Sequence, residues 1–220
     1  ALSSFDRAAD WADLIRYLQR VNDVLKRHEN VGPVIPEQLL LGKRLAQCLD
    51  SSFQSGVHLK ALETYRNVFT RLGPRELAKS LYIYSSGLFP LLSNSSTPVK
   101  RDLLSLYEEY FLPVGSDLRN VLDGLVLALL PGLEDETSEF YSIVLKLLAD
   151  LQSIVDDDLR FSVSLWRALL LAPNRILALA FLTHCYRKET VPLPPPEIVA
   201  PALTAALAEK DSLVQRNVLD

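Results

Sequence analysis

Hydrophobic side chains recur along this chain at the spacing of one helix face. In the stretch 97–111 apolar residues stand three and four positions apart, at Val99, Leu103, Leu104, Tyr107, Tyr110 and Phe111. This pattern predicts an amphipathic helix that opens at Thr97-Pro98, with Ser96 as its N-cap. A matching face begins 42 residues earlier at Val57 and again 41 residues later at Phe140. The recurrence predicts a helical repeat.

The predicted second helix of each pair supplies an anchor position for the repeat. The anchors are Val57, Val99, Phe140, Leu177 and Val214, at intervals of 42, 41, 37 and 37 residues. N-cap residue types stand three positions before the last four anchors, at Ser96, Thr137, Asn174 and Asp211. A unit of two helices in about 40 residues is typical of HEAT and armadillo repeats. We therefore predict an all-α fold, an α-solenoid of about five helix pairs preceded by an N-terminal capping helix. An irregular all-α domain is the alternative.

Prolines, glycines and caps divide the pattern into predicted segments. The predicted helices are 8–28, 36–49, 57–72, 74–81, 86–93, 98–111, 117–130, 136–156, 158–171, 175–187, 197–208 and 212 onwards. We predict one elongated domain, 1–220. Its parts are a capping helix in 1–30, central repeats in 31–187, a proline-rich connection in 188–196 and the start of a further repeat in 197–220. The absence of Met and the unfinished pattern at Asp220 predict an excerpt of a longer protein.

Composition narrows the class of protein. The chain carries 27 acidic and 23 basic residues, a net charge of −4, which argues against a nucleic-acid partner. Its two cysteines, Cys48 and Cys185, are far apart in sequence and set among Leu and Ala, which favours buried thiols in a reducing compartment. The start of the chain lacks a signal-peptide pattern, and the most apolar stretch, 165–182, is interrupted by charged and proline residues. The expected location is cytoplasmic.

Catalytic motifs are not found in the sequence. It contains no G-x-S-x-G, no glycine-rich phosphate loop, no H-E-x-x-H and no C-x-x-C. The histidines are His28, His58 and His184, and a structural or solvated role is expected for His28 and His58. Acidic clusters at 134–136 and 156–158 fall at predicted helix starts, where they favour capping over metal binding or acid–base work. We predict no enzyme, catalytic residue, cofactor or metal. The alternative, a hydrolase using His184 or an acidic cluster, predicts a pocket in which these groups converge.

The turns between predicted helices are the candidate binding elements. Asp50–Gly56, Ser93–Thr97 and Glu134–Ser138 fall at equivalent places in successive repeats and should line one edge of the array. The candidate partner-binding residues in and near these turns are Lys43, Arg44, Ser52, Gln54, His58, Lys60, Asn94, Lys100, Arg101, Glu134, Asp135 and Glu136. A second hypothesis is recognition of anionic phospholipid headgroups by the basic members Lys43, Arg44, Lys60, Lys100 and Arg101.

Long stretches of the chain resemble the N-terminal region of the Dopey family. They are ALSSFDRAADWADLIRYL at 1–18, KRLAQCLDSSFQSGVHLKALETY at 43–65, GLFPLLSNSSTPVKRDLLSLYEEYFLPVG at 87–115, LVLALLPGLEDETSEFY at 125–141 and LVQRNVLD at 213–220. The resemblance departs mainly in 189–196.

The resemblance implies a role for the chain that its composition does not. Dopey proteins are very large and peripheral to membranes of the Golgi, trans-Golgi network and endosomes. They work with a large Sec7-related scaffold and a lipid-flippase ATPase in trafficking, and have no established catalytic motif. The resemblance therefore implies a non-enzymatic scaffold or adaptor for protein–protein interactions in Golgi–endosome traffic.

Overall fold

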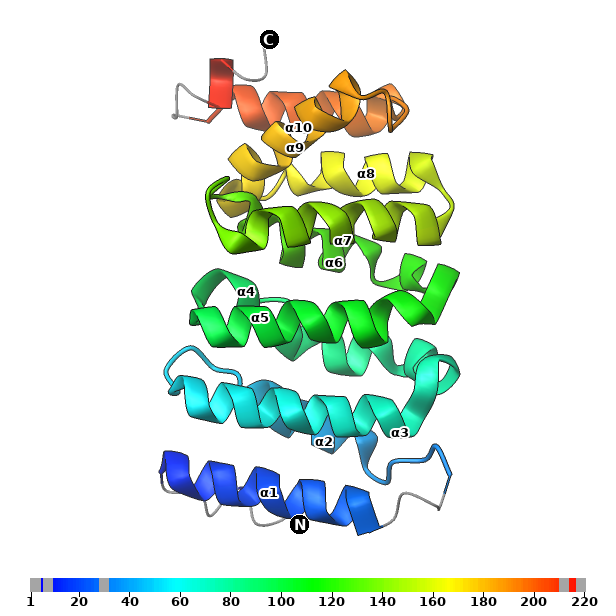
Figure 1. The fold of residues 1–220 in the computed structure, drawn as a ribbon. Helices are drawn as coiled ribbons and strands as arrows, with labels where there is room; N and C mark the ends of the chain where they lie inside the picture. Colours follow the sequence, from blue (N-terminus) through cyan, green and yellow to red (C-terminus); the bar gives the residue numbers. More distant parts are fainter. Residues whose placement is uncertain (1–4, 6–9, 28–31, 210–213, 217–220) are drawn as a thin grey trace. The chain divides into compact units, whose positions relative to one another are not determined.

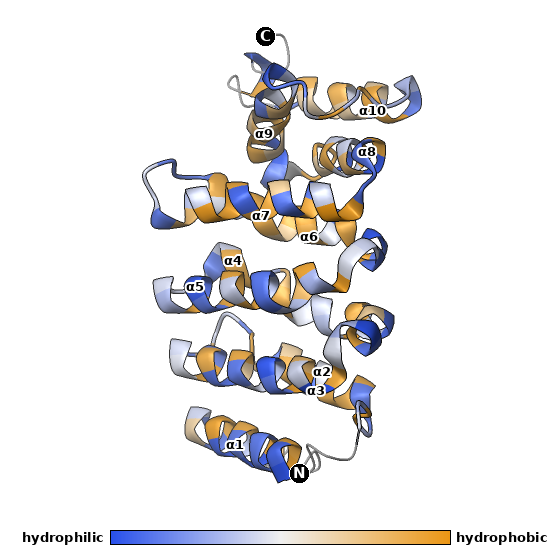
Figure 2. Ribbon diagram, turned by 45° about the vertical axis from the view of Figure 1, so that its right-hand side comes forward, coloured by the Kyte–Doolittle hydropathy of each residue, from blue (hydrophilic) through white to orange (hydrophobic). Residues whose placement is uncertain are grey.

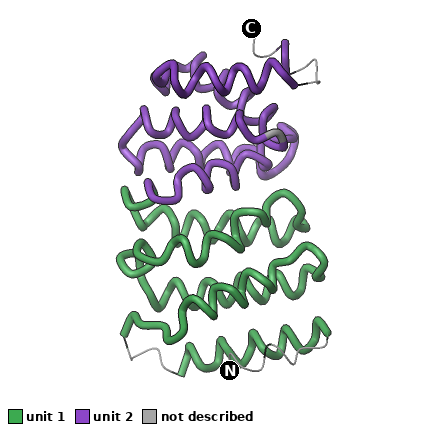
Figure 3. The backbone as a smooth tube through the Cα atoms, turned by 180° about the vertical axis from the view of Figure 1, so that it is seen from behind, with its two compact units in different colours: residues 1–118 green, residues 119–220 purple. Residues whose placement is uncertain are grey.

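A computed structural model describes Phe5 and residues 10–27, 32–209 and 214–216. Within these residues the chain is helical and forms no strand, so the predicted all-α class is confirmed. His28 and the predicted cap Asp211 lie outside the described residues. The contacts divide the chain into two compact units, unit 1 (Ala1–Leu118) and unit 2 (Arg119–Asp220) (Figure 3). The predicted single repeat domain and its solenoid arrangement stay predictions.

The helices follow one another with short connections (Figure 1). In chain order they are α1 (Trp11–Arg27), α2 (Gln38–Gln47), α3 (Ser55–Leu88), α4 (Leu91–Asn94), α5 (Thr97–Leu106), the π-helical turn η3 (Tyr107–Phe111), the 3₁₀ segment η4 (Leu112–Asn120), α6 (Leu122–Leu129), η5 (Leu130–Leu133), α7 (Glu139–Val155), α8 (Asp158–Ala168), η6 (Ala172–Asn174), α9 (Arg175–Arg187) and α10 (Pro196–Leu207).

Unit 1 is organised around α3, which packs against α1, α2 and α5. Along α1 hydrophilic and hydrophobic residues alternate at helical spacing (Figure 2), which places Leu14, Leu18 and Val21 in the core. Aromatic rings fill the centre of the unit, where Phe69 stands 5.3 Å from Tyr84 and 5.9 Å from Phe111 between ring centroids. Unit 1 therefore has an aromatic core.

A single residue breaks α3 into two arms. Gly73 has φ 66° and ψ 170°, a conformation that suits glycine, and Pro74 starts the second arm. The predicted stop at Gly73 is confirmed. The predicted separate helices 74–81 and 86–93 are wrong, because the second arm continues to Leu88. Neither glycine nor proline lies between Pro74 and Gly87, so nothing in that segment interrupts the helix.

The second arm of α3 lies very close to α2. A Cβ on Gly87 would stand 2.7 Å from the Cα of Ala46 and 2.7 Å from the Tyr65 hydroxyl. Such distances leave no room for a side chain. The glycine therefore sets the separation of these two helices.

Two partly exposed ion pairs of Arg66 join the first arm of α3 to α5 and η3. The Arg66 guanidinium donates to the Asp102 carboxylate at 2.8 Å and to Ser105 Oγ at 3.1 Å, and it also pairs with Glu109. Hydrogen bonds to Asp102 and the charges of Asp102 and Glu109 raise the pKa of Arg66, although desolvation is the largest single influence and opposes them. This network holds the π-helical turn against α3.

Unit 2 is built from α6 to α10, with α8 in contact with α6, α7, α9 and α10. Leu and Val dominate its buried residues. The predicted helix 117–130 is wrong in its first part, because η4 is a 3₁₀ segment broken at Gly115 (φ 76°, ψ −146°) and α6 begins only at Leu122. The irregular backbone follows Pro113 and Gly115, which disfavour a continuous helix.

Caps fix the ends of several helices in unit 2. Ser138, not the predicted Thr137, caps α7, accepting a hydrogen bond from Phe140 N at 3.3 Å. Asp157 caps α8 by accepting one from Arg160 N at 2.9 Å, which agrees with the capping role expected for the cluster 156–158. Arg119 Nε donates to the carbonyl of Val155 at 2.8 Å, at the end of α7.

Candidate protein-interaction site

The turn between α2 and α3 is held by a carboxylate. Asp50 accepts hydrogen bonds from the backbone N–H of Ser52 at 2.9 Å and from its hydroxyl at 2.6 Å. These two bonds are the main reason that the pKa of Asp50 lies below its ordinary value. His58 is only 4% exposed and its Nε2 stands 2.9 Å from the Asp50 carbonyl, so the histidine supports the turn from beneath. The result is a rigid, anionic turn.

The turn before α7 repeats this geometry in unit 2. Asp135 accepts hydrogen bonds from the N–H of Thr137 at 2.8 Å and from its hydroxyl at 2.7 Å. The same pair of bonds lowers the pKa of Asp135. The sequence of the turn after α4, Asn94-Ser95-Ser96, has the same spacing of an Asx residue and a hydroxyl. The two aspartate-held turns are therefore ordered by hydrogen bonds within the turn itself.

The first two predicted turns meet at one pocket in unit 1. Asp50 and Ser51 come from the first turn and Asn94 from the second, and Leu49 and Leu91 add apolar wall. The pocket has a volume of about 270 Å³. Residues 41 or more positions apart in sequence are thus presented together, as the repeat pattern predicts for equivalent turns.

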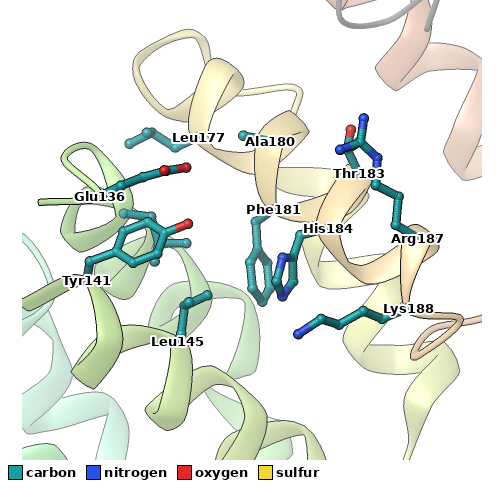
Figure 4. A pocket seen from close by; sticks show the side chains of 11 residues that line it. Glu136, Tyr141, Leu145, Leu177, Ala180, Phe181, Thr183, His184, Arg187 and Lys188 are labelled. Atoms are coloured by element: carbon teal, nitrogen blue, oxygen red, sulfur yellow. The ribbon is translucent and has the colours of Figure 1, made fainter.

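The third predicted turn borders a separate pocket of about 340 Å³ in unit 2. Figure 4 shows Glu136 and Tyr141 on one side, and the Phe181 and His184 rings facing them from α9. Those two rings are stacked, with centroids 6.1 Å apart and an interplanar angle of 14°. Lys188 extends beneath the His184 ring. The pocket therefore combines flat aromatic surface with a carboxylate and an ammonium group.

This pocket has Glu136 and His184 in its wall, two of the groups that the hydrolase hypothesis invokes. Burial, and secondly the charge of Lys188, lowers the pKa of His184, so the imidazole is neutral at pH 7. The neighbouring Thr183 hydroxyl donates to the Leu179 carbonyl at 3.0 Å. Cys185 is buried and its thiol pKa is raised by that burial, so a reactive thiolate is not formed. The Thr183 hydroxyl and the Cys185 thiol are therefore not activated as nucleophiles.

Comparison with known proteins places the whole chain in one family. The family model described as "Dopey, N-terminal" matches residues 1–220. The chain belongs to the Dopey family. It is 39% identical to Protein DOP1B of Xenopus laevis over 228 residues, which cover all of this chain and 10% of that protein. The chain is 37% identical to the Protein DOP1 homolog of Drosophila melanogaster over 228 residues, which cover all of this chain and 9% of that protein. It is 34% identical to Protein DOP1 of Saccharomyces cerevisiae over 193 residues, which cover 86% of this chain and 11% of that protein.

These relatives are much longer than the chain. It spans about a tenth of the length of the DOP1 proteins that it matches. No solved structure gave a significant match. The family resemblance inferred from the sequence is confirmed.

The remaining candidate residues of this Dopey segment differ in how accessible they are. Gln54 stands at the N-cap position of α3 and is exposed, as are Ser52 and Glu134. Lys43 and Arg101 are also exposed. The Lys60 side chain is only 17% exposed and pairs with Glu63 at 2.7 Å.

Arg44 and Lys100 are half-buried members of the predicted basic set. The Arg44 guanidinium lies 4.4 Å from the centroid of the Phe5 ring and donates to Gln47 at 3.1 Å. Only two of the five basic residues predicted to meet lipid are therefore fully at the surface, which weakens the case for a basic membrane-binding face.

Sequence reasoning missed the pocket side of α9. Leu177, Phe181, His184 and Lys188 follow one another at intervals of four, three and four residues, which places them on one helix face. The spacing of these four residues can be read from the sequence. A helix face of this kind can pack in the core or border a pocket, and only the tertiary structure shows that this one is a pocket wall.

Both cysteines lie in the part of the chain that the structure describes. Cys48 and Cys185 are free and buried, and burial raises the pKa of Cys48 to about 12. Over the described ranges no group of three or more His, Cys, Asp or Glu side chains could hold a metal ion. None of the helices in that part of the chain is long and apolar enough to cross a bilayer.

Proposed function

We propose that this Dopey segment is a non-enzymatic scaffold that binds other proteins in membrane traffic between the Golgi and endosomes. The observation that carries the proposal is the pair of turn-lined pockets, one in each unit, beside turns built by the same Asp-to-hydroxyl hydrogen bonds. Pre-ordered turns reduce the entropy that is lost when a partner binds. Exposed anionic and amide groups around an apolar floor are typical of a surface that recognises a polypeptide.

Family membership supports the trafficking context. The partners expected from the family resemblance are a large Sec7-related scaffold and a lipid-flippase ATPase. The proposed location is the cytoplasmic face of Golgi, trans-Golgi network and endosome membranes, and the proposed arrangement of the helix pairs is a HEAT- or armadillo-like solenoid. The proposal assigns no catalytic residue, cofactor or metal.

The test uses paired substitutions in the full-length protein. Asn94→Arg and Glu136→Lys each alter a pocket wall, whereas Ser116→Arg and Glu189→Lys make similar changes at exposed positions outside the predicted turns and outside both pocket walls. We expect the pocket variants to weaken capture of a partner about tenfold or more and the other two to have little effect. Cross-linking mass spectrometry should place the partner on the two turns. Wild-type binding by the Asn94→Arg/Glu136→Lys double variant would exclude these pockets.

The competing lipid hypothesis is tested by flotation. Vesicles with and without anionic phospholipid are mixed with the purified chain at low salt, where surface electrostatics are strongest. Flotation that needs the anionic lipid and is lost in Lys43→Glu/Arg101→Glu would favour the membrane-binding alternative. We expect the chain to stay unbound, because only these two members of the basic set are exposed and the other three are half-buried.

A further inference from the structure

The connection between α9 and α10 contains an unusual run of prolines. Four of the five residues Pro192-Leu193-Pro194-Pro195-Pro196 are proline. Proline fixes its own φ near −65° and pushes the residue before it into extended or polyproline II geometry. Pro195 has φ −58° and ψ 152°, the values of a polyproline II helix. We call residues 192–195, which lead up to the start of α10 at Pro196, the proline strip.

Burial along the strip has the period of a polyproline II helix. Such a helix has three residues per turn, so every third residue lies on the same edge. Val191 and Pro194, three apart, are buried, whereas Pro192, Leu193 and Pro195 are exposed, Leu193 to 66%. One edge is thus packed on the protein and the other two face outwards.

The strip is held in place by hydrogen bonds to its neighbours. The carbonyl of Pro192 accepts one from the buried Ser162 hydroxyl at 2.7 Å and one from the Tyr186 hydroxyl at 3.5 Å. Just before the strip, the carbonyl of Thr190 accepts one from Gln152 Nε2 at 2.7 Å. By contrast, the carbonyls of Leu193 and Pro194 accept none from the described residues. Of these two acceptors, the carbonyl of the exposed Leu193 is open to a partner, whereas Pro194 lies on the buried edge.

We infer that the proline strip is a docking site for a protein domain with an aromatic-lined groove of the SH3, WW or EVH1 kind. Such grooves accept the two outward edges of a polyproline II helix and leave the third edge unread. The exposed residues Pro192, Leu193 and Pro195 form the two outward edges here. The buried pair Val191 and Pro194 lies on the third edge. The strip is formed before binding, so docking costs little conformational entropy.

The flank of the strip narrows the choice of groove. Glu197 follows the last proline directly and is exposed at the start of α10. A groove with a basic side chain beside its aromatic rings would complement this carboxylate. This site is separate from the turn-lined pockets and does not depend on them.

The test is a binding screen with the intact chain. Purified SH3, WW and EVH1 domains are immobilised, and saturable binding to at least one of them is expected. Pro192→Ala/Leu193→Ala removes a side chain from each outward edge but keeps both carbonyls, and should weaken that binding about tenfold or more. Leu207→Ala is the matched control, because Leu207 is an exposed apolar residue of α10 outside the strip, and binding should not change.

Two measurements keep the result interpretable. Fluorescence of Trp166 reports the fold of the double variant, because Trp166 Nε1 donates to Tyr186, which in turn contacts the strip. A synthetic peptide of residues 190–198 should compete with the intact chain for the same domain. The inference is overturned if no domain binds, if the double variant binds like the wild type, or if the peptide does not compete.

Discussion

The two units connect their helices by different means. In unit 1, α2 and the second arm of α3 approach so closely that Gly87 has no space for a methyl group, and aromatic rings such as Phe69 and Tyr84 fill the centre. In unit 2 the buried residues are mainly aliphatic, and arginine side chains bind the carbonyls at helix ends.

Arg175 is the clearest example of the second means. It is 7% exposed, its Nε donates to the carbonyl of Leu169 at 2.7 Å, and its guanidinium pairs with Glu209. One side chain thus connects the end of α8, the start of α9 and the residues after α10. The comparison teaches that the same two-helix sequence pattern can be stabilised by close packing or by charged caps, and that the pattern alone does not say which.

Removal of the buried cap should give the largest effect. Arg175→Met removes the donor to the Leu169 carbonyl and the ion pair with Glu209, so we expect unfolding of unit 2 to become easier by about 3 kcal/mol. Arg167→Met is the control, because Arg167 pairs with Asp123 at the surface, with both side chains about half exposed. That loss should be below about 1 kcal/mol. Urea denaturation followed by Trp166 fluorescence in a Trp11→Phe background measures both. Equal losses of stability in Arg175→Met and Arg167→Met would show that the buried arginine contributes no more than a surface ion pair.

Close packing in unit 1 can be tested with glycines. Gly87→Ala should destabilise the unit by about 1–3 kcal/mol, because the new Cβ would meet the backbone of Ala46. Gly56→Ala should be neutral or stabilising by up to about 1 kcal/mol, since Gly56 is also helical but its nearest contact would be Ile15 at 3.9 Å. Hydrogen exchange of α2 and α3 measures the local effect. If Gly87→Ala is no more destabilising than Gly56→Ala, close helix packing would not distinguish unit 1 from unit 2.

The smallest effect concerns the pocket of unit 2. The ordinary pKa of His184 is 6.5, and burial followed by the charge of Lys188 lowers it in the folded chain. The imidazole of His184 therefore binds a proton more readily in the unfolded chain than in the folded chain. The contribution of His184 to stability is complete above about pH 6.5 and declines as the pH falls through that value towards the lower folded pKa.

Lys188→Met should raise the pKa of His184 but leave it below 6.5, because burial is the larger cause. Arg187→Met should leave it unchanged, since Arg187 does not contribute to the shift. NMR titration of the imidazole decides the matter. A return to the ordinary pKa in Lys188→Met would show that charge, not burial, dominates the pocket.

Much of the helix pattern was predictable because local signals agreed with the packing. Ser96 and Asp157 stand before helices and were recognisable as polar starts, and Asp157 makes the expected cap hydrogen bond. Asp10, which the prediction placed inside the first helix, accepts a hydrogen bond from the N–H of Asp13 at the start of α1. Gly73 marked the break in α3. The errors fall where local signals were weak. The helix 74–88 has an apolar pattern that two short helices could equally explain, and the 3₁₀ segment after Pro113 depends on how the backbone turns.

The candidate site was predictable only in its turns. Asx and hydroxyl residues at Asp50-Ser52 and Asp135-Thr137 signal a fixed turn in sequence. The partners of those turns could not be inferred, because Tyr141 and Phe181 reach the same pocket from different helices. The burial of Lys60 beside Glu63 likewise depends on tertiary packing.

The corner at Gly73 has a consequence for how this region can vary in length. The two arms of α3 meet through one residue, with no loop to absorb an insertion. One added residue in the first arm would rotate everything beyond it by about 100° about the helix axis. Tyr84 would then leave the aromatic core and Gly87 would no longer face Ala46. The corner fixes the rotational phase of the second arm, so insertions and deletions should be tolerated in the turns of unit 1 and not inside α3.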